Sequence, residues 1–312
     1  MINLSRLKKC YNNAKALDVQ LDVQTIVHSR ILQELEDSRF CPQSMISFFK
    51  ECDKYIVMRL GTVTYHIYYK KSLTAAGSAM IKSIQRTHAL MEYCNIQKPI
   101  NVHIIMAPYK RYFPTVPSEI IDTIHINGGF TTSSSNDIFI IRSEEASKVI
   151  LHEVLHHCKF VHNNNWTAHQ LDRLYTAFNI SKSTSLYPNE AMVELWATMM
   201  HCMFIVLDYG LPLNMILDTE VHYSLQQCRR ILRMQNGLSG GKWREHTNAY
   251  CYIIFKTILL MNIKVLAHTY PYDPEYITQF LIDHKSDIDD TRRLKEKKWC
   301  NASLRMMKSS DM

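Results

Sequence analysis

The sequence lacks the glycine-rich loops that bind phosphate groups. Neither GxxxxGK[ST] nor GxGxxG occurs among its 8 glycines, so nothing in it indicates a P-loop or a dinucleotide-binding fold. The pair Gly240-Gly241 is instead interpreted as a mobile connection between two predicted helices, placed where it could act as a lid.

Closely spaced cysteine pairs are also missing. The 9 cysteines stand singly at positions 10, 41, 52, 94, 158, 202, 228, 251 and 300, with no CxxC and an odd total. This pattern favours free thiols in a reducing compartment over a disulfide scaffold or a cysteine-ligated zinc site. We therefore expect an intracellular, cytoplasmic protein.

No segment has the character of a signal peptide or a membrane span. Residues 1–9 lack the apolar core of a signal peptide. The longest apolar stretches, residues 195–207 and 250–266, are too short or are interrupted by polar and charged side chains. We expect no membrane span.

Charge of one sign does not dominate the chain. It has 36 basic and 29 acidic residues, a net charge of +7, and its densest basic segment is residues 292–299. A solvated helix face explains that segment better than a nucleic-acid site, because acidic residues dilute the charge and stacking aromatics are not interleaved with it. Nucleic-acid binding through this helix, with an accidental metal motif elsewhere, is the third and weakest hypothesis.

The predicted elements divide the chain into a mixed first half and a helical second half. Strands are expected at 55–60, 62–69, 100–106, 124–132 and 137–142. Helices are expected in the first 50 residues, strongest at 19–35, and then at 75–94, 143–160, 167–178, 187–207, 213–235, 247–264, 274–284 and 289–306.

This order predicts an α+β fold with one small sheet. We expect a helical segment at 1–50, an α/β unit at 51–160 and a helical unit at 161–312. A chain of 312 residues with 46% hydrophobic composition can bury one large core or two moderate lobes across a cleft.

The predicted helix at 143–160 contains the pentad His152-Glu153-Val154-Leu155-His156. Residues four apart lie on one face of a helix, so both imidazoles can bind one metal ion. Glu153 beside them can reach a water molecule on that ion. The alternative is a helix with two partly buried histidines and no metal.

The segments before the pentad suit a metal helix that follows a strand. Strand 137–142 leads into Ser143 as N-cap, and Glu144 and Glu145 form an acidic first turn. Segment 124–132 is predicted to be the antiparallel partner of that strand.

Within that partner, Gly128, Gly129 and Phe130 would form an edge strand beside the metal helix. Main-chain hydrogen bonds could hold an extended substrate there, and the glycines would allow close backbone approach. A glycine bulge in an ordinary hairpin is the alternative.

Two carboxylates one turn apart occupy the helix predicted at 187–207. Glu190 and Glu194 lie in a segment otherwise suited to burial, and a nearby cation would account for them. A catalytic zinc usually has three protein ligands and a water, so the pentad needs one more ligand.

With HExxH followed by Asn189-Glu190 and Glu194, the chain resembles the gluzincin metallopeptidases. The resemblance covers residues 124–207 and implies a zincin-like fold with an active-site cleft between the halves. It implies Glu190 as the third zinc ligand and Glu194 as acceptor for the free ring N–H of His152. Glu194 stands where an aspartate is common in that family, and no catalytic histidine is obvious near the C-terminus.

The rival third ligand is His162. It stands ten residues after His152, the spacing of the metzincin pattern HExxHxxGxxH. The glycine of that pattern is Lys159 here, which takes a left-handed conformation poorly, and His162 heads an asparagine-rich loop. We favour Glu190. His157 points about 100° away from His156 on an ideal helix and is not expected to be a ligand.

A site of His152, His156 and Glu190 predicts zinc-dependent hydrolysis of a peptide or protein substrate. Zinc would activate a water and polarise the scissile carbonyl, with Glu153 as general base. The resemblance implies an oxyanion donor in the helical half, for which we choose Tyr252 over His246 and Tyr250. A buried core tyrosine is the alternative interpretation.

A second functional hypothesis stays open at this point. The chain could be a catalytically silent protein of zincin fold that serves binding or assembly. Residues 189–198 and 247–260 also resemble segments of predicted metallopeptidases of large DNA viruses, which implies a location in the host cytoplasm or the virion. Substrate, and endopeptidase or exopeptidase action, are not indicated.

Overall fold

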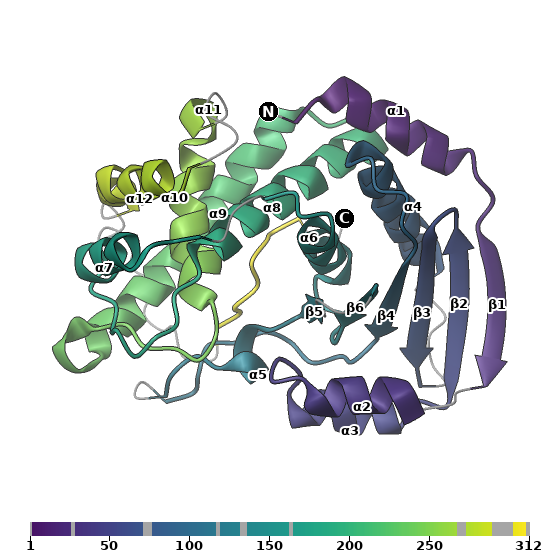
Figure 1. Ribbon diagram of the computed structural model, residues 1–312, viewed down its shortest axis with the longest axis horizontal. Helices are drawn as coiled ribbons and strands as arrows, with labels where there is room; N and C mark the ends of the chain where they lie inside the picture. Colours follow the sequence, from purple (N-terminus) through teal and green to yellow (C-terminus); the bar gives the residue numbers. More distant parts are fainter. Residues whose placement is uncertain are drawn as a thin grey trace.

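A six-stranded mixed sheet forms one side of the computed structural model (Figure 1). The structure describes residues 2–25, 29–70, 77–116, 119–131, 136–161, 165–266, 273–288 and 302–309. The strands are β1 (Gln20–Thr25), β2 (Lys54–Leu60), β3 (Val63–Tyr69), β4 (Ile100–Ile105), β5 (Gly129–Thr131) and β6 (Asp137–Ile140), in the order β1-β2-β3-β4-β6-β5.

The strand directions follow from the connections between strands. β1, β2 and β3 are antiparallel neighbours, and the hairpin between β2 and β3 turns at Gly61, which has a φ of 56°. β3, β4 and β6 are parallel, and β5 returns antiparallel beside β6. β5 is therefore an edge strand of this sheet.

Helices cover both faces of the sheet. α1 (Leu4–Lys15), α4 (Gly77–Tyr93) and α6 (Ala146–His157) lie on one face, and α2 (Ser29–Asp37) and α3 (Gln43–Lys50) lie on the other (Figure 1). Successive residues of β6 alternate between the two cores, with Ile138 and Ile140 in the larger one and Phe139 in the smaller one. The parallel strands β4 and β6 are therefore buried on both faces, as expected for parallel strands.

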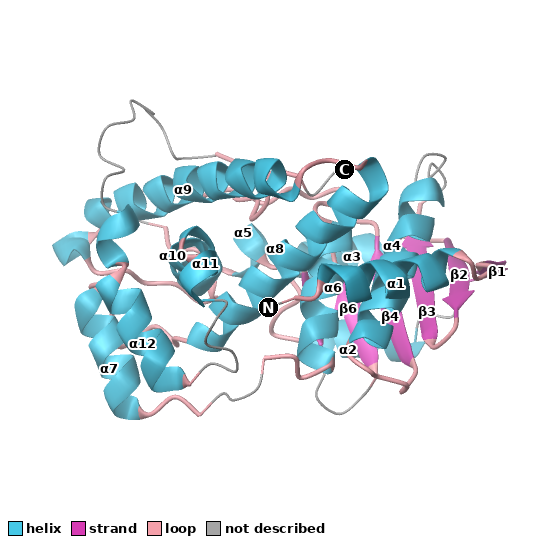
Figure 2. Cartoon of the chain, turned by 90° about the horizontal axis from the view of Figure 1, so that it is seen from above, coloured by secondary structure: helices cyan, strands magenta, loops and turns pink. Residues whose placement is uncertain are grey.

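The second half of the chain is a layer of helices beside the sheet (Figure 2). Its helices are α7 (Ala168–Ala177), α8 (Pro188–Tyr209), α9 (Leu213–Gly237), α10 (Lys256–Met261), α11 (Ile263–Leu266) and α12 (Pro274–Asp283), with a 3₁₀ turn η1 (Ser239–Gly241) and a π-helix η2 (Cys251–Phe255). α8 packs against α6 and joins the two halves.

α8 is apolar enough, by length and composition, to cross a membrane. It has 22 residues, but 83% of its apolar window is buried inside the molecule. Burial on this scale explains its composition as that of a central core helix.

Three expected elements differ in the structure. Residues 20–25, within the predicted helix 19–35, form the strand β1, because pairing with β2 outweighs local helix propensity. Residues 123–126, predicted as strand, form the short helix α5 (Thr123–Ile126). There the Asp122 side chain accepts from the Thr123 N–H and His125 accepts from the Asp122 N–H.

The third difference concerns the predicted C-terminal helix 289–306. Residues 289–301 lie outside the described residues, and 302–309 are not helical. The Glu145 carboxylate accepts hydrogen bonds from the Met306 and Met307 N–H groups, and Glu220 on α9 accepts from those of Lys308 and Ser309. Segment 302–309 is thus bound between the two halves by buried carboxylates.

Candidate metal centre

Helix α6, which contains the HExxH pentad, begins later than the sequence indicates. Ser143 was expected as its N-cap, but the Ser143 hydroxyl donates to the Ala107 carbonyl instead. Glu145 is the N-cap residue, with a left-handed φ of 60°. Its carboxylate accepts from the Arg111 guanidinium at 2.6 Å. The acidic pair predicted to stabilise the first turn therefore anchors buried loops instead.

His152 and His156 lie one turn apart on α6 and point at the same place. Their Nε2 atoms are 3.1 Å apart. His152 is buried, whereas His156 is about one quarter exposed, with 27% of its side chain accessible. One face of α6 thus presents two ring nitrogens, one of which faces open space.

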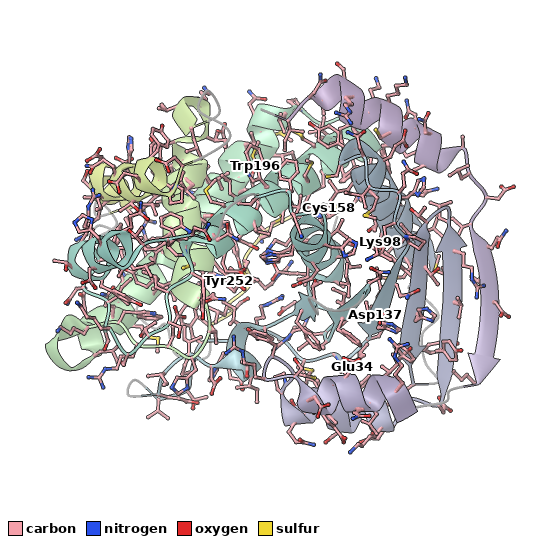
Figure 3. All side chains as sticks on the ribbon, viewed as in Figure 1. Glu34, Lys98, Asp137, Cys158, Trp196 and Tyr252 are labelled. Atoms are coloured by element: carbon pink, nitrogen blue, oxygen red, sulfur yellow. The ribbon has the colours of Figure 1, made fainter. Side chains whose placement is uncertain are left out.

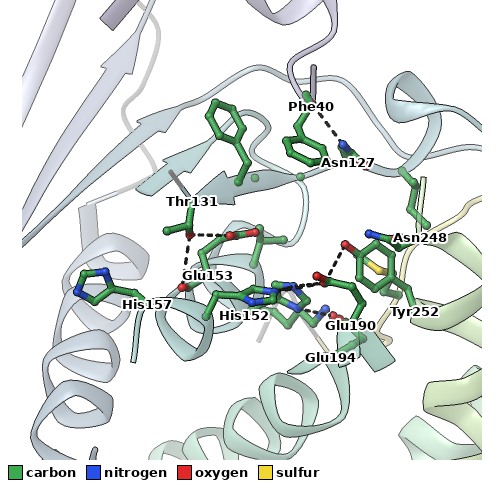
Figure 4. Close-up of a pocket in the computed structure, with 18 of the residues that line it drawn as sticks. Phe40, Asn127, Thr131, His152, Glu153, His157, Glu190, Glu194, Asn248 and Tyr252 are labelled. Carbon is green, nitrogen blue, oxygen red and sulfur yellow. Dashed lines mark hydrogen bonds and ion pairs between the residues drawn. The ribbon is translucent and has the colours of Figure 1, made fainter. Parts of the chain in front are cut away.

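Glu190 of α8 supplies a third donor atom at this place (Figure 4). Its Oε2 lies 3.3 Å from His156 Nε2 and 3.5 Å from His152 Nε2. Pro188 at the start of α8 places Glu190 in the first turn of that helix. The three donor atoms lie within 4.8 Å of one another and could hold a metal ion.

Glu194, one turn further along α8, orients the ring of His152. Its Oε2 accepts from His152 Nδ1 at 3.0 Å, which leaves Nε2 of that ring facing His156 and Glu190. Burial disfavours the imidazolium, but the bonds to Glu190 and Glu194 outweigh burial and raise the pKa of His152 to about 9. The site therefore favours positive charge at its centre.

Lys148 completes this network and was not identified from the sequence. It lies one turn before His152 on α6, is fully buried, and forms an ion pair with Glu194. Burial raises the pKa of Glu194, but Lys148 and then His152 outweigh it and lower that pKa to about 2. A lysine on an apolar helix face four residues before a histidine was the available signal.

Glu153 lies beside the three donor atoms and is held by the edge strand. Thr131 at the end of β5 donates its hydroxyl to Glu153 Oε2 at 2.8 Å (Figure 4). Both residues line a cavity of about 690 Å³, which also contains His152, His156 and Glu190. The carboxylate is therefore in a fixed position next to the two histidines.

Tyr252 reaches the same centre from the helical half. Its hydroxyl donates to Glu190 Oε2 at 3.3 Å, and its ring meets His152 edge to face. Burial, followed by the charge of Glu190, raises the pKa of Tyr252, so its hydroxyl stays protonated. Tyr252 lies in the π-helix η2, a rare geometry that is frequent at functional sites.

The other two aromatic candidates of that segment lie elsewhere. Tyr250 is buried in the core, and its hydroxyl lies within hydrogen-bond distance of Gln235. His246 is 66% exposed and faces Asp122. Only Tyr252 of the three lines the cavity.

The glycines of the predicted edge strand serve the protein's own packing. A Cβ at Gly128 would lie 1.9 Å from the Arg111 guanidinium, and one at Gly129 would lie 2.7 Å from the Phe139 carbonyl oxygen. Gly128, Gly129 and Phe130 nevertheless all line the cavity. The absence of a side chain at these glycines therefore makes room for neighbouring groups of the protein itself, not for the backbone of a substrate.

The backbone at Lys159 differs from the expectation that a lysine would avoid a left-handed conformation there. Lys159 does adopt the left-handed conformation, with φ of 49°, and ends α6 through a hydrogen bond from the Phe160 N–H to the Leu155 carbonyl. His162 itself lies outside the described residues. The described donor triangle does not include His157.

Comparison with known proteins adds no assignment. No protein-family model matches this chain, and no curated protein or solved structure matches it.

Proposed function

We propose that this protein is a zinc-dependent peptidase of zincin-like design, with His152, His156 and Glu190 as the zinc ligands. The donor triangle is the observation that carries this proposal. Zinc lies about 2.0–2.1 Å from nitrogen and oxygen ligands, so two ligands of a tetrahedral site are roughly 3.3–3.4 Å apart. The three separations here are 3.1, 3.3 and 3.5 Å. The spacing and the donor types both fit.

The groups around the triangle fit a catalytic rather than a structural site. Structural zinc sites have four protein ligands, whereas catalytic sites keep a position open. Three donors are present here, and they face a cavity of about 690 Å³. Glu194 on the far nitrogen of His152 matches the carboxylate–histidine arrangement that orients metal ligands.

Glu153 has the position of a general base. When bound, zinc would polarise the scissile carbonyl and make an attacking water more acidic. Glu153 would take the proton of that water and later deliver it to the leaving amine. Thr131 keeps the carboxylate oriented for this transfer.

Tyr252 and β5 complete the reaction site. The protonated Tyr252 hydroxyl would donate to the oxyanion that forms on the carbonyl oxygen. The Gly128 carbonyl accepts from Ile141, so strand alternation directs the backbone groups of Gly129 and Thr131 to the free edge of β5. An extended peptide would pair with those groups across the cavity.

The test compares Glu153→Gln with wild type under equal zinc loading. We expect the variant to keep its zinc and to lose at least about 100-fold in peptide hydrolysis, the scale of a general base. Glu36→Gln, at an exposed ion pair with Lys50, is the matched control and should retain activity. Equal hydrolysis by wild type and Glu153→Gln would refute the mechanism. Zinc binding without hydrolysis of any peptide by wild type would identify a silent binding protein.

A further inference from the structure

The two ends of the cavity differ in charge. β5 and α6 run in the same direction, because Gly129 lies against Val149 and Thr131 lies against Glu153 one turn further along α6. The Thr131 end of β5 therefore lies toward the C-terminus of α6. At that end the cavity is lined by His157, Lys159 and Lys98.

Lys98 and Lys159 reach the same end from different segments. Lys98, labelled in Figure 3, precedes β4 and lines the same cavity as Lys159. The charge of Lys98 acts on His157, which places the two close together. Both lysines are exposed, and neither forms an ion pair within the described part of the chain.

Among the described residues, the segments around this end contribute no acidic side chain beyond Glu153. Residues 93–103, 128–131 and 154–161 contain no Asp or Glu. At the opposite end the cavity is lined by neutral residues such as Asn248 and Met306 and by Arg111, whose guanidinium forms an ion pair with Glu145. The lysines without an ion pair therefore lie on one side of the donor triangle.

The direction of β5 relates this charge to the substrate sequence. A peptide that pairs antiparallel with β5, the commoner arrangement, runs from the Thr131 end to the Gly129 end. Its residues on the amino side of the scissile bond then lie near the C-terminus of α6. The residues on the carboxyl side lie near Asn248 and Met306.

We propose that the site selects peptides with an acidic side chain on the amino side of the scissile bond, bound by Lys98 and Lys159 with His157 as a further donor. This inference rests on the proposed peptidase function and specifies its substrate class. Two exposed ion pairs correspond to a preference for glutamate over glutamine of about five- to tenfold. Salt should weaken that preference, because exposed charges are screened.

Binding to zinc-loaded Glu153→Gln tests the charge preference without requiring hydrolysis. The probes are fluorescein-labelled octapeptide pools, degenerate at the four central positions, with Glu or Gln at either the two amino-terminal or the two carboxyl-terminal positions. We expect amino-terminal Glu pools to bind about five- to tenfold more tightly than their Gln counterparts. Carboxyl-terminal Glu should give no gain. Equal affinity of all pools, a gain only from carboxyl-terminal Glu, or no binding of any pool would overturn the inference.

Charge variants identify the residues responsible. In the same background, Lys98→Glu should abolish the preference, and Lys159→Asn should reduce it while tolerating the left-handed backbone. Lys9→Glu on the exposed face of α1 makes the same charge change outside the cavity and should leave the preference intact. An equal loss in Lys9→Glu and Lys98→Glu would show a nonspecific charge effect and refute the proposed site.

Hydrolysis of the same pools by wild type separates the two proposals. A Glu preference in binding without hydrolysis would leave the charged subsite standing and remove the peptidase function. Hydrolysis without any charge preference would support the peptidase function and refute the charged subsite.

Discussion

The Thr131 hydroxyl donates a hydrogen bond to Glu153 Oε2 at 2.8 Å, which joins the edge strand β5 to helix α6. Loss of one hydrogen bond to a charged group costs about 1.5 kcal/mol, or roughly tenfold in rate. We predict that Thr131→Val lowers kcat for peptide hydrolysis about tenfold with KM and zinc content unchanged. Thr131→Ser keeps the hydroxyl and should retain activity. A drop in zinc content in Thr131→Val would show that Thr131 supports the fold of the site rather than Glu153.

Lys148 and Glu194 form a buried ion pair behind His152. Lys148→Met leaves the Glu194 carboxylate without its main counter-charge, and breaking a buried pair from one side costs about 3–5 kcal/mol. We predict that Lys148→Met lowers the free energy of unfolding of the metal-free protein by that amount, measured by urea unfolding. Lys50→Met, at an exposed pair with Glu36, should cost less than about 1 kcal/mol. Equal losses in the two variants would contradict the role assigned to the buried pair.

Glu220 holds segment 302–309 against α9. Its carboxylate accepts from the Lys308 N–H at 3.0 Å and the Ser309 N–H at 2.8 Å. We predict that Glu220→Gln lowers the free energy of unfolding by about 2–3 kcal/mol, because bonds to a charged acceptor are weakened and one amide N–H faces a donor. Glu275→Gln, at an exposed pair with Arg173, is the control. Indistinguishable unfolding curves for the two variants would rule out this anchoring role.

Glu245 gives the protein a pH dependence of stability. Burial raises its pKa from 4.5 to about 7. Between these values the folded protein keeps a proton that the unfolded chain has released, so stability falls as pH rises through this window and is level above it. The total change is about 3 kcal/mol, at about 1.4 kcal/mol per pH unit.

Glu245→Gln removes this titration. Its stability relative to wild type should therefore improve by about 3 kcal/mol between pH 4.5 and pH 7.5, measured by urea unfolding at both pH values. Parallel behaviour of the two proteins would show that the Glu245 carboxyl is not held protonated.

The sequence predicted best what depends on local spacing. The spacing of His152 and His156 alone predicts that they share a helix face. Glu190 and Glu194 were predicted to face a cation because they are carboxylates in an otherwise apolar helix. The structure brings all four together. The hairpin of β2 and β3 and the helix α8 also follow from local patterns.

What the sequence did not predict depends on distant partners. Residues 20–25 are a strand because they pair with the edge of β2. Residues 302–309 are not helical, and Glu145 and Glu220 bind their backbone instead. Lys148 belongs to the network around His152 only because α8 places Glu194 beside it. Lys159 takes a left-handed conformation because the end of α6 requires it, which residue type alone argued against.

Zinc content is the most direct test of the account. Protein dialysed against an equimolar zinc buffer would be analysed by elemental mass spectrometry, as wild type, Glu190→Ala, His162→Ala and the surface control Glu36→Gln. We predict one zinc per chain in wild type, His162→Ala and Glu36→Gln. Glu190→Ala should contain clearly less than one zinc per chain, because removal of this ligand should lower the affinity for zinc by at least about tenfold. Metal-free wild type, or zinc that survives Glu190→Ala but not His162→Ala, would contradict it.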